Sequence, residues 1–85
     1  MKYIVLKKGP SVNAGDVLFC WDETMDRSIT GYIVRVAENT SLNDYDVYIR
    51  WNDIFVAFQR VGMKELLTNI KLGLWRYKSG FKKRL

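Results

Sequence analysis

Residues 45–51, YDVYIRW, alternate between two kinds of side chain along their whole length. Apolar and aromatic residues occupy the odd-numbered positions, and the even-numbered positions are Asp46, Tyr48 and Arg50. Because successive side chains of a strand point to opposite faces, this is the pattern of an antiparallel strand with one buried face and one wet face. Such a strand needs partners in a sheet, and this requirement constrains the chain most strongly.

Further segments rich in β-branched and aromatic residues flank this one, at residues 2–7, 17–21, 29–37 and 54–61. Turn-forming residues separate them, including Gly9-Pro10, Gly15 and the segment 38–44. Gly15 is expected to supply a positive φ, and Gly31 is a candidate for a bulge or tight bend. Five short strands separated by turns predict a small antiparallel barrel or sandwich.

At Gly62 the apolar spacing changes from that of a strand to that of a helix. The apolar positions that follow have the i, i+3, i+4, i+7 spacing of an amphipathic helix and are Met63, Leu66, Leu67, Ile70 and Leu74. We assign residues 63–78 to a helical segment, in which the helix begins at Met63 and ends between residues 72 and 77. Gly73 is an alternative stop. The 85 residues then form one domain: a β-barrel over 1–62, this helical segment and a basic tail over 79–85.

Three strand segments, GDVLFCW, GYIVRVA and YDVYIRWND, resemble the strand series of small SH3-like barrels of the Tudor and KOW kind. The likeness covers residues 13–58, with Gly31 in place of the KOW glycine, while the basic residues that precede it in the KOW motif are absent. The resemblance implies a strongly bent five-stranded barrel that binds nucleic acid or peptides. Tudor domains hold methylated ligands in an aromatic cage, for which the candidates are Trp21, Tyr32, Tyr48, Trp51 and Phe55.

The common motifs of catalytic and metal sites are missing from the chain. It has no histidine, so Ser-His and Cys-His pairs and the usual zinc sites are excluded. Its carboxylates cluster in turn-rich segments, where Asp is expected to bond the backbone. We therefore expect no enzyme activity, metal, cofactor or small-molecule substrate.

Cys20 is the only cysteine and lies in an apolar run, where it is expected to be a small buried residue. A single thiol without a disulfide framework favours a reducing compartment. No stretch has the length of a membrane span or of a secretory core. We expect a cytoplasmic protein that does not bind membranes.

Positive charge is concentrated at the end of the chain. Residues 63–85 carry seven basic residues against Glu65 alone, a net of +6, whereas residues 1–62 carry seven basic and eight acidic residues, a net of −1. Together they give the formal net charge of +5. Lysine and arginine can neutralise phosphates and aromatic rings can stack on bases, so this stretch predicts nucleic-acid binding, to DNA or RNA.

On a helix that reaches Lys78, a stripe of lysines and Trp75 would face away from the barrel. The predicted contacts are Lys64, Lys71, Trp75, Arg76, Lys78, Phe81, Lys82, Lys83 and Arg84. A second candidate is a sheet face with Arg35, Tyr48 and Arg50, although the nearby Asp46 and Glu38 also suit a salt-bridged surface. Two alternatives remain: the cations stabilise a helix C-terminus while Trp75 is core, or the chain is a protein-interaction module that docks on an acidic partner or an enzyme.

Overall fold

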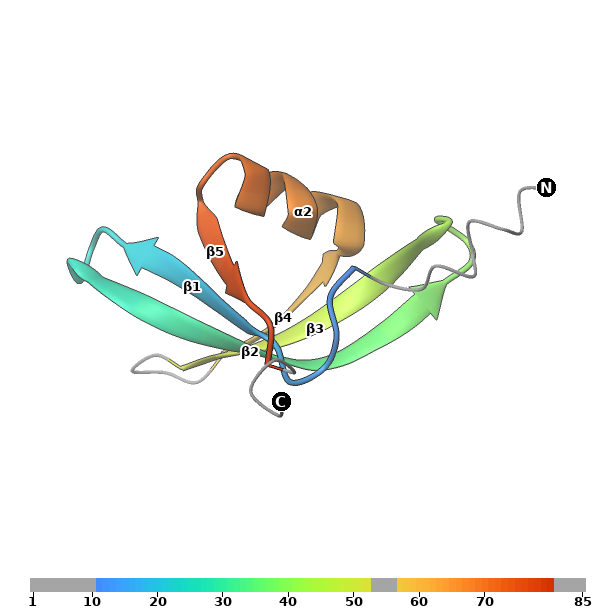
Figure 1. The fold of residues 1–85 in the computed structure, drawn as a ribbon, viewed down its shortest axis with the longest axis horizontal. Helices are drawn as coiled ribbons and strands as arrows, with labels where there is room; N and C mark the ends of the chain where they lie inside the picture. The colour runs from blue at the N-terminus through green and yellow to red at the C-terminus, as the bar shows by residue number, and fades with distance from the viewer. Residues whose placement is uncertain (1–10, 53–56, 81–85) are drawn as a thin grey trace.

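The computed structural model describes residues 11–52 and 57–80 of the chain. Its elements are β1 (Val17–Asp22), β2 (Arg27–Asn39), β3 (Asp44–Asn52), β4 (Ala57–Gly62), α2 (Met63–Lys71) and β5 (Trp75–Lys78). The strands form one five-stranded sheet in the order β4-β3-β2-β1-β5, and every pair is antiparallel (Figure 1). The predicted mainly-β class is therefore confirmed. The sheet is not closed into a barrel, because β4 and β5 are its two edges.

The set of strands differs from the prediction at both ends. The strand expected at residues 2–7 lies outside the described residues, and the fifth strand is β5, in a segment for which a helix was expected. Residues 54–56 of the strand expected at 54–61 also lie outside them, and β4 covers the remainder. No helix in the described part of the chain is long and apolar enough to cross a membrane.

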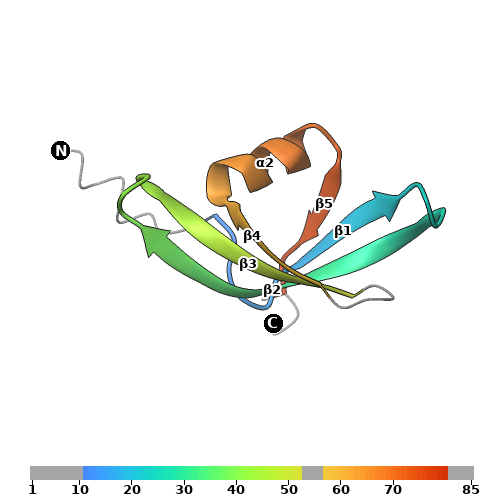
Figure 2. The same ribbon diagram turned by 180° about the vertical axis from the view of Figure 1, so that it is seen from behind.

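The sheet is strongly bent, and α2 lies in its concave side between the arms made by the β1–β2 and β2–β3 hairpins (Figures 1 and 2). β2 contributes to both arms, and its register with β3 shifts between Ile33 and Arg35, which leaves Val34 as the bulged residue. The bulge is therefore at Val34 and the expectation of a bulge at Gly31 is wrong. A bulge bends its strand and increases the local twist, which suits this position.

Gly31 has a different role, in the packing of the core. A Cβ atom at Gly31 would lie 2.7 Å from two ring atoms of Trp51, so the absence of a side chain lets the indole approach β2 closely. Trp51 packs edge-to-face against Trp75, with ring centroids 5.4 Å apart, and donates its indole N–H to Gln59 at 2.8 Å. The rest of the core consists of Val12, Leu18, Ile33, Val47, Ile49, Val61, Met63 and Leu66.

The helix begins at Met63 as predicted but ends at Lys71, so the prediction of a helical segment reaching residue 78 is wrong. Gly73 has a φ of +82° and donates its backbone N–H to the carbonyl of Ile70. The backbone N–H of Leu74 donates to the carbonyl of Asn69. These are the two bonds of a Schellman motif, with Gly73 as the left-handed residue after the cap. Gly73 therefore ends the helix, which was the alternative expected from the sequence, and the chain turns there into β5.

Asp16 joins the start of β1 to the end of β5. The Asp16 side chain is fully buried and accepts hydrogen bonds from the backbone N–H of Asn13 at 2.9 Å, the Tyr77 hydroxyl at 2.7 Å and the backbone N–H of Gly80 at 2.9 Å. Three donors offset the desolvation cost of burying the carboxyl group. Gly15, with a φ of +98°, adopts the predicted left-handed turn just before it. This carboxyl group fixes where the short edge strand β5 ends.

Candidate functional site

The two faces of the sheet differ completely in chemistry. The inner face packs against α2 and carries the apolar core. The face turned away from α2, which we call the outer face, carries the alternate residues of every strand. Its cations on the five strands are Arg35, Arg50, Arg60, Arg76 and Lys78, and all of them are exposed.

Strand register aligns one residue from each strand in a continuous row across the outer face. From edge to edge the paired positions are Phe58, Arg50, Tyr32, Val17 and Lys78. Of the two rings, Phe58 is 71% exposed and Tyr32 is 42% exposed, and Arg50 lies between them. Val17 separates Tyr32 from the second cation, Lys78. Cross-strand neighbours on one face have Cβ atoms about 5 Å apart, so these side chains form one surface.

A second row on the same face contains the residues of the smaller site predicted from the sequence. Arg60 pairs with Tyr48, and Tyr48 pairs with Arg35 on the other side. The Arg35 guanidinium lies over the Tyr48 ring, 5.2 Å from its centroid, in a cation–π contact. Arg50 is two residues further along β3 on the same face. The structure therefore brings Arg35, Tyr48 and Arg50 together as expected.

Of the two acids that weakened this prediction, one lies on the other face and the other is hydrogen-bonded to an asparagine side chain. Glu38 pairs with Tyr45, so it belongs to the face on which α2 lies. Asp46 is on the outer face two residues before Tyr48, and its carboxylate accepts hydrogen bonds from the side-chain amide of Asn39, at 3.2 and 3.3 Å. The outer face consequently keeps a positive excess.

The main site predicted from the sequence is divided by the fold. Trp75 is only 9% exposed and belongs to the core, so the predicted Lys-Trp-Lys stripe on a helix does not exist. Arg76 and Lys78 are exposed on β5 and join the outer face, whereas Lys64 and Lys71 are exposed on α2, on the opposite side of the sheet. Phe81, Lys82, Lys83 and Arg84 lie outside the described residues.

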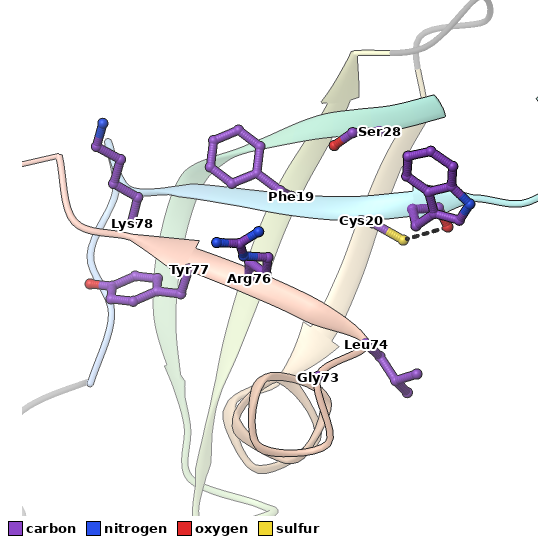
Figure 3. A pocket seen from close by; sticks show the side chains of 9 residues that line it. Phe19, Cys20, Ser28, Gly73, Leu74, Arg76, Tyr77 and Lys78 are labelled. Atoms are coloured by element: carbon purple, nitrogen blue, oxygen red, sulfur yellow. Dashed lines mark hydrogen bonds between the residues drawn. The ribbon is translucent and has the colours of Figure 1, made fainter. Parts of the chain in front are cut away.

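An open pocket of about 700 Å³ lies at the junction of β1 and β5 (Figure 3). Its walls include Phe19 and Trp21 of β1, and Leu74 lies where the chain enters β5. The hydroxyl of Ser28 and the guanidinium of Arg76 supply polar groups. Because Phe19 pairs with Arg76, and Trp21 with Ser28, these four residues share the outer face, and the pocket continues the cationic surface.

Cys20 also lines the pocket and is half-buried against the core, so it is less enclosed than the sequence suggested. Desolvation raises the pKa of the Cys20 thiol, and the negative charge of Asp22 raises it further, against the opposing effect of a hydrogen bond with Trp75. A raised pKa keeps the thiol protonated and a poor nucleophile at neutral pH.

The aromatic cage implied by the resemblance is not assembled. Trp51 is buried on the inner face, whereas Trp21, Tyr32 and Tyr48 are on the outer face, and Phe55 lies outside the described residues. Within residues 11–52 and 57–80, no group of three or more His, Cys, Asp or Glu side chains is placed to hold a metal ion.

Three outer-face residues, Phe19, Phe58 and Arg60, were not predicted as site residues, and Trp21 and Tyr32 were predicted only as members of an aromatic cage. Phe19 and Tyr32 alternate with core residues of their own strands, so a signal was present for them, whereas the neighbours of Phe58 are both exposed. What could not be read from the sequence was the register that places them side by side. Comparisons of this chain with protein-family models, curated proteins and solved structures found no match.

Proposed function

We propose that this protein is a non-enzymatic nucleic-acid-binding module and that the outer face of the sheet is its contact surface. The observation that carries the proposal is the row across all five strands, in which Arg50 lies between the exposed rings of Phe58 and Tyr32, and Lys78 follows after Val17. Cations on such a surface neutralise backbone phosphates, and exposed rings offer platforms on which bases stack. Both interactions need little base-specific hydrogen bonding, so we propose weak sequence preference.

The outer face suits this role better than the helix side. Lys64 and Lys71 lie on α2, which contains no aromatic residue, and Trp75, the ring expected beside them, is in the core. The cations of residues 82–84 follow β5 in the sequence and, in this proposal, add phosphate contacts to those of Arg76 and Lys78.

For the fold, we propose that the chain is a relative of the SH3-like barrels. This rests on the strand residues that resemble the Tudor and KOW families, together with a strongly bent sheet whose edges β4 and β5 are joined in sequence through α2. We also propose a cytoplasmic protein, on the evidence of its single cysteine.

Two double variants with the same change in charge test the contact surface. Arg50→Gln with Arg60→Gln removes two outer-face cations, and Lys64→Gln with Lys71→Gln removes two from α2; each lowers the formal net charge from +5 to +3. All four side chains are exposed, so both proteins should fold. Fluorescence anisotropy with a labelled oligothymidylate, measured over a range of salt concentrations, reports the affinity.

The outer-face variant should lose about tenfold or more in affinity at low salt. The magnitude of its slope of log K against log salt should fall by about 1.4, because two phosphate contacts are lost and each contributes about 0.7 for a single strand. The α2 variant should bind like the wild type. The reverse pattern would assign binding to the helix side, and absence of binding by the wild type to any DNA or RNA at low salt would refute the proposal. A chain ending at Gly80 should bind more weakly but measurably, with a shallower slope.

A protein partner is the alternative function, and one observation favours it. Leu67, Leu72 and Leu74 are 38%, 66% and 58% exposed around the C-terminal end of α2. Exposed apolar side chains gathered in one region are typical of protein contacts. This alternative predicts a complex with a protein that resists salt and nuclease treatment. Leu72→Asp should weaken this complex, and the two double charge variants should leave it unchanged.

A further inference from the structure

We infer that the outer face binds single-stranded nucleic acid and holds one unpaired base in the pocket between β1 and β5. The inference rests on the proposed function and specifies the form of its ligand. Its first support is continuity. Phe19 pairs with Arg76 and Trp21 pairs with Ser28, and all four residues line the pocket. The pocket is therefore at the end of the outer face, the surface that also carries the row from Phe58 to Lys78.

The second support is the chemistry of the pocket walls. Trp21 is 55% exposed and Leu74 is 58% exposed, so a large apolar area faces solvent on both sides of the pocket. A volume of about 700 Å³ is within the range of ligand pockets and is open at the surface (Figure 3). A nucleobase has apolar faces for such walls and a polar edge for hydrogen bonds, which the Ser28 hydroxyl and the Arg76 guanidinium can supply.

The third support is the distribution of open rings on the rest of the face. The Tyr48 ring already has the Arg35 guanidinium over it, so it is not a free platform. Tyr32 and Phe58 are open, and the row to which they belong spans about 19 Å, since neighbouring strands are about 4.8 Å apart. A short strand laid across the sheet can therefore meet Phe58, Arg50, Tyr32 and Lys78 and end at the pocket.

A duplex cannot use these features, because its bases are stacked on one another and their faces are not available without unpairing. Phosphate contacts alone would give the single strand no advantage: a duplex, with its higher charge density, would bind at least as tightly, and a strand without bases would bind like one with bases. The combination of open rings with a pocket therefore favours single strands, and the preference should depend on the bases.

Three probes of equal length separate these contributions: an oligothymidylate, its duplex with oligoadenylate, and the same sugar–phosphate strand made entirely of abasic sites. The wild-type chain should bind the oligothymidylate more tightly than either of the others. Trp21→Ala should weaken binding to the oligothymidylate by about 5- to 150-fold, the range for loss of one stacked base. It should leave binding to the abasic strand unchanged.

Trp21→Phe keeps a ring in place and should restore most of the affinity, and Leu72→Ala is the matched control, because Leu72 is exposed outside the pocket. Circular dichroism confirms that each variant is folded. If the duplex and the abasic strand bind as tightly as the oligothymidylate, or if Trp21→Ala weakens all probes equally, the inference is wrong while phosphate binding by the outer face stands. Failure of all probes to bind the wild type at low salt would refute the proposed function itself.

Discussion

At the scale of single residues, Gly31 shows most directly how a position is determined by its neighbours. It pairs with Leu18 on one side and Trp51 on the other, and both of these side chains are buried on the inner face. A Cβ atom at Gly31 would meet Trp51 at 2.7 Å and the Ile49 side chain at 2.9 Å. The indole cannot move away freely, because Trp75 packs on it and Gln59 accepts its N–H.

Gly31→Ala should therefore destabilise the fold by about 1–3 kcal/mol, the usual cost of overpacking a core. Urea denaturation followed by tryptophan fluorescence measures the change in the free energy of unfolding. Thr30→Ala is the control, since Thr30 is adjacent on the outer face and its substitution should cost much less. Equal stability of Gly31→Ala and the wild type would contradict the assigned packing of Trp51.

At the scale of elements, the end of α2 decides what the last part of the chain can do. The helix has an amphipathic pattern that continues in sequence to Leu74, but the left-handed residue Gly73 ends it and Leu74 becomes exposed. Its N-terminus has no side-chain cap of its own; instead Asp44 of β3 accepts the backbone N–H of Lys64 at 3.4 Å. Both ends of the helix are thus set by geometry that joins it to strands.

Gly73→Ala should lower the free energy of unfolding by about 1 kcal/mol, because an L-residue pays that much to adopt a left-handed conformation. No atom lies within 4 Å of a Cβ at this position, so the effect comes from the backbone alone. Thermal unfolding followed by circular dichroism measures it, with Lys71→Ala as the control in the same turn. A gain in stability would mean that the helix can continue past Gly73, which would contradict the Schellman ending.

At the scale of the whole molecule, Asp16 and Tyr77 connect the beginning of the described chain to its end. They are 61 residues apart in sequence, and their 2.7 Å hydrogen bond holds β5 against β1 at the edge of the sheet. Burial raises the pKa of Tyr77 above its ordinary value of 10.0, and the hydrogen bond to Asp16 and its negative charge raise it further. The phenol must stay protonated to donate this bond.

Because the pKa of Tyr77 is higher in the folded chain than in the unfolded chain, its contribution to stability is complete below the unfolded pKa. It is lost as pH rises through the folded value. Tyr77→Phe should cost about 1–3 kcal/mol at pH 7, as expected for a hydrogen bond to a charged group. The stability difference between wild type and variant should shrink above about pH 10. Urea denaturation at several pH values tests this, and a difference that does not change with pH would contradict it.

The sequence by itself determined the local features of this protein. Alternation along residues 45–51 correctly separated the buried Val47, Ile49 and Trp51 from the outer Tyr48 and Arg50, because the two-residue period of a strand is a local property. The change of period at Gly62 correctly located the start of α2, and Gly15 and Gly73 were identified as turn residues. These predictions depend only on neighbours along the chain.

Only the tertiary structure decided which residues meet. Apolar spacing continued the helix past Gly73, but the segment after it gains more by pairing with β1 and burying Trp75 against Trp51 than by extending the helix. That choice sends Arg76 and Lys78 to the outer face and leaves Lys64 and Lys71 on the other side. Strand register is set by contacts between distant segments. The row from Phe58 to Lys78, on which the proposed function depends, therefore could not be read from the sequence.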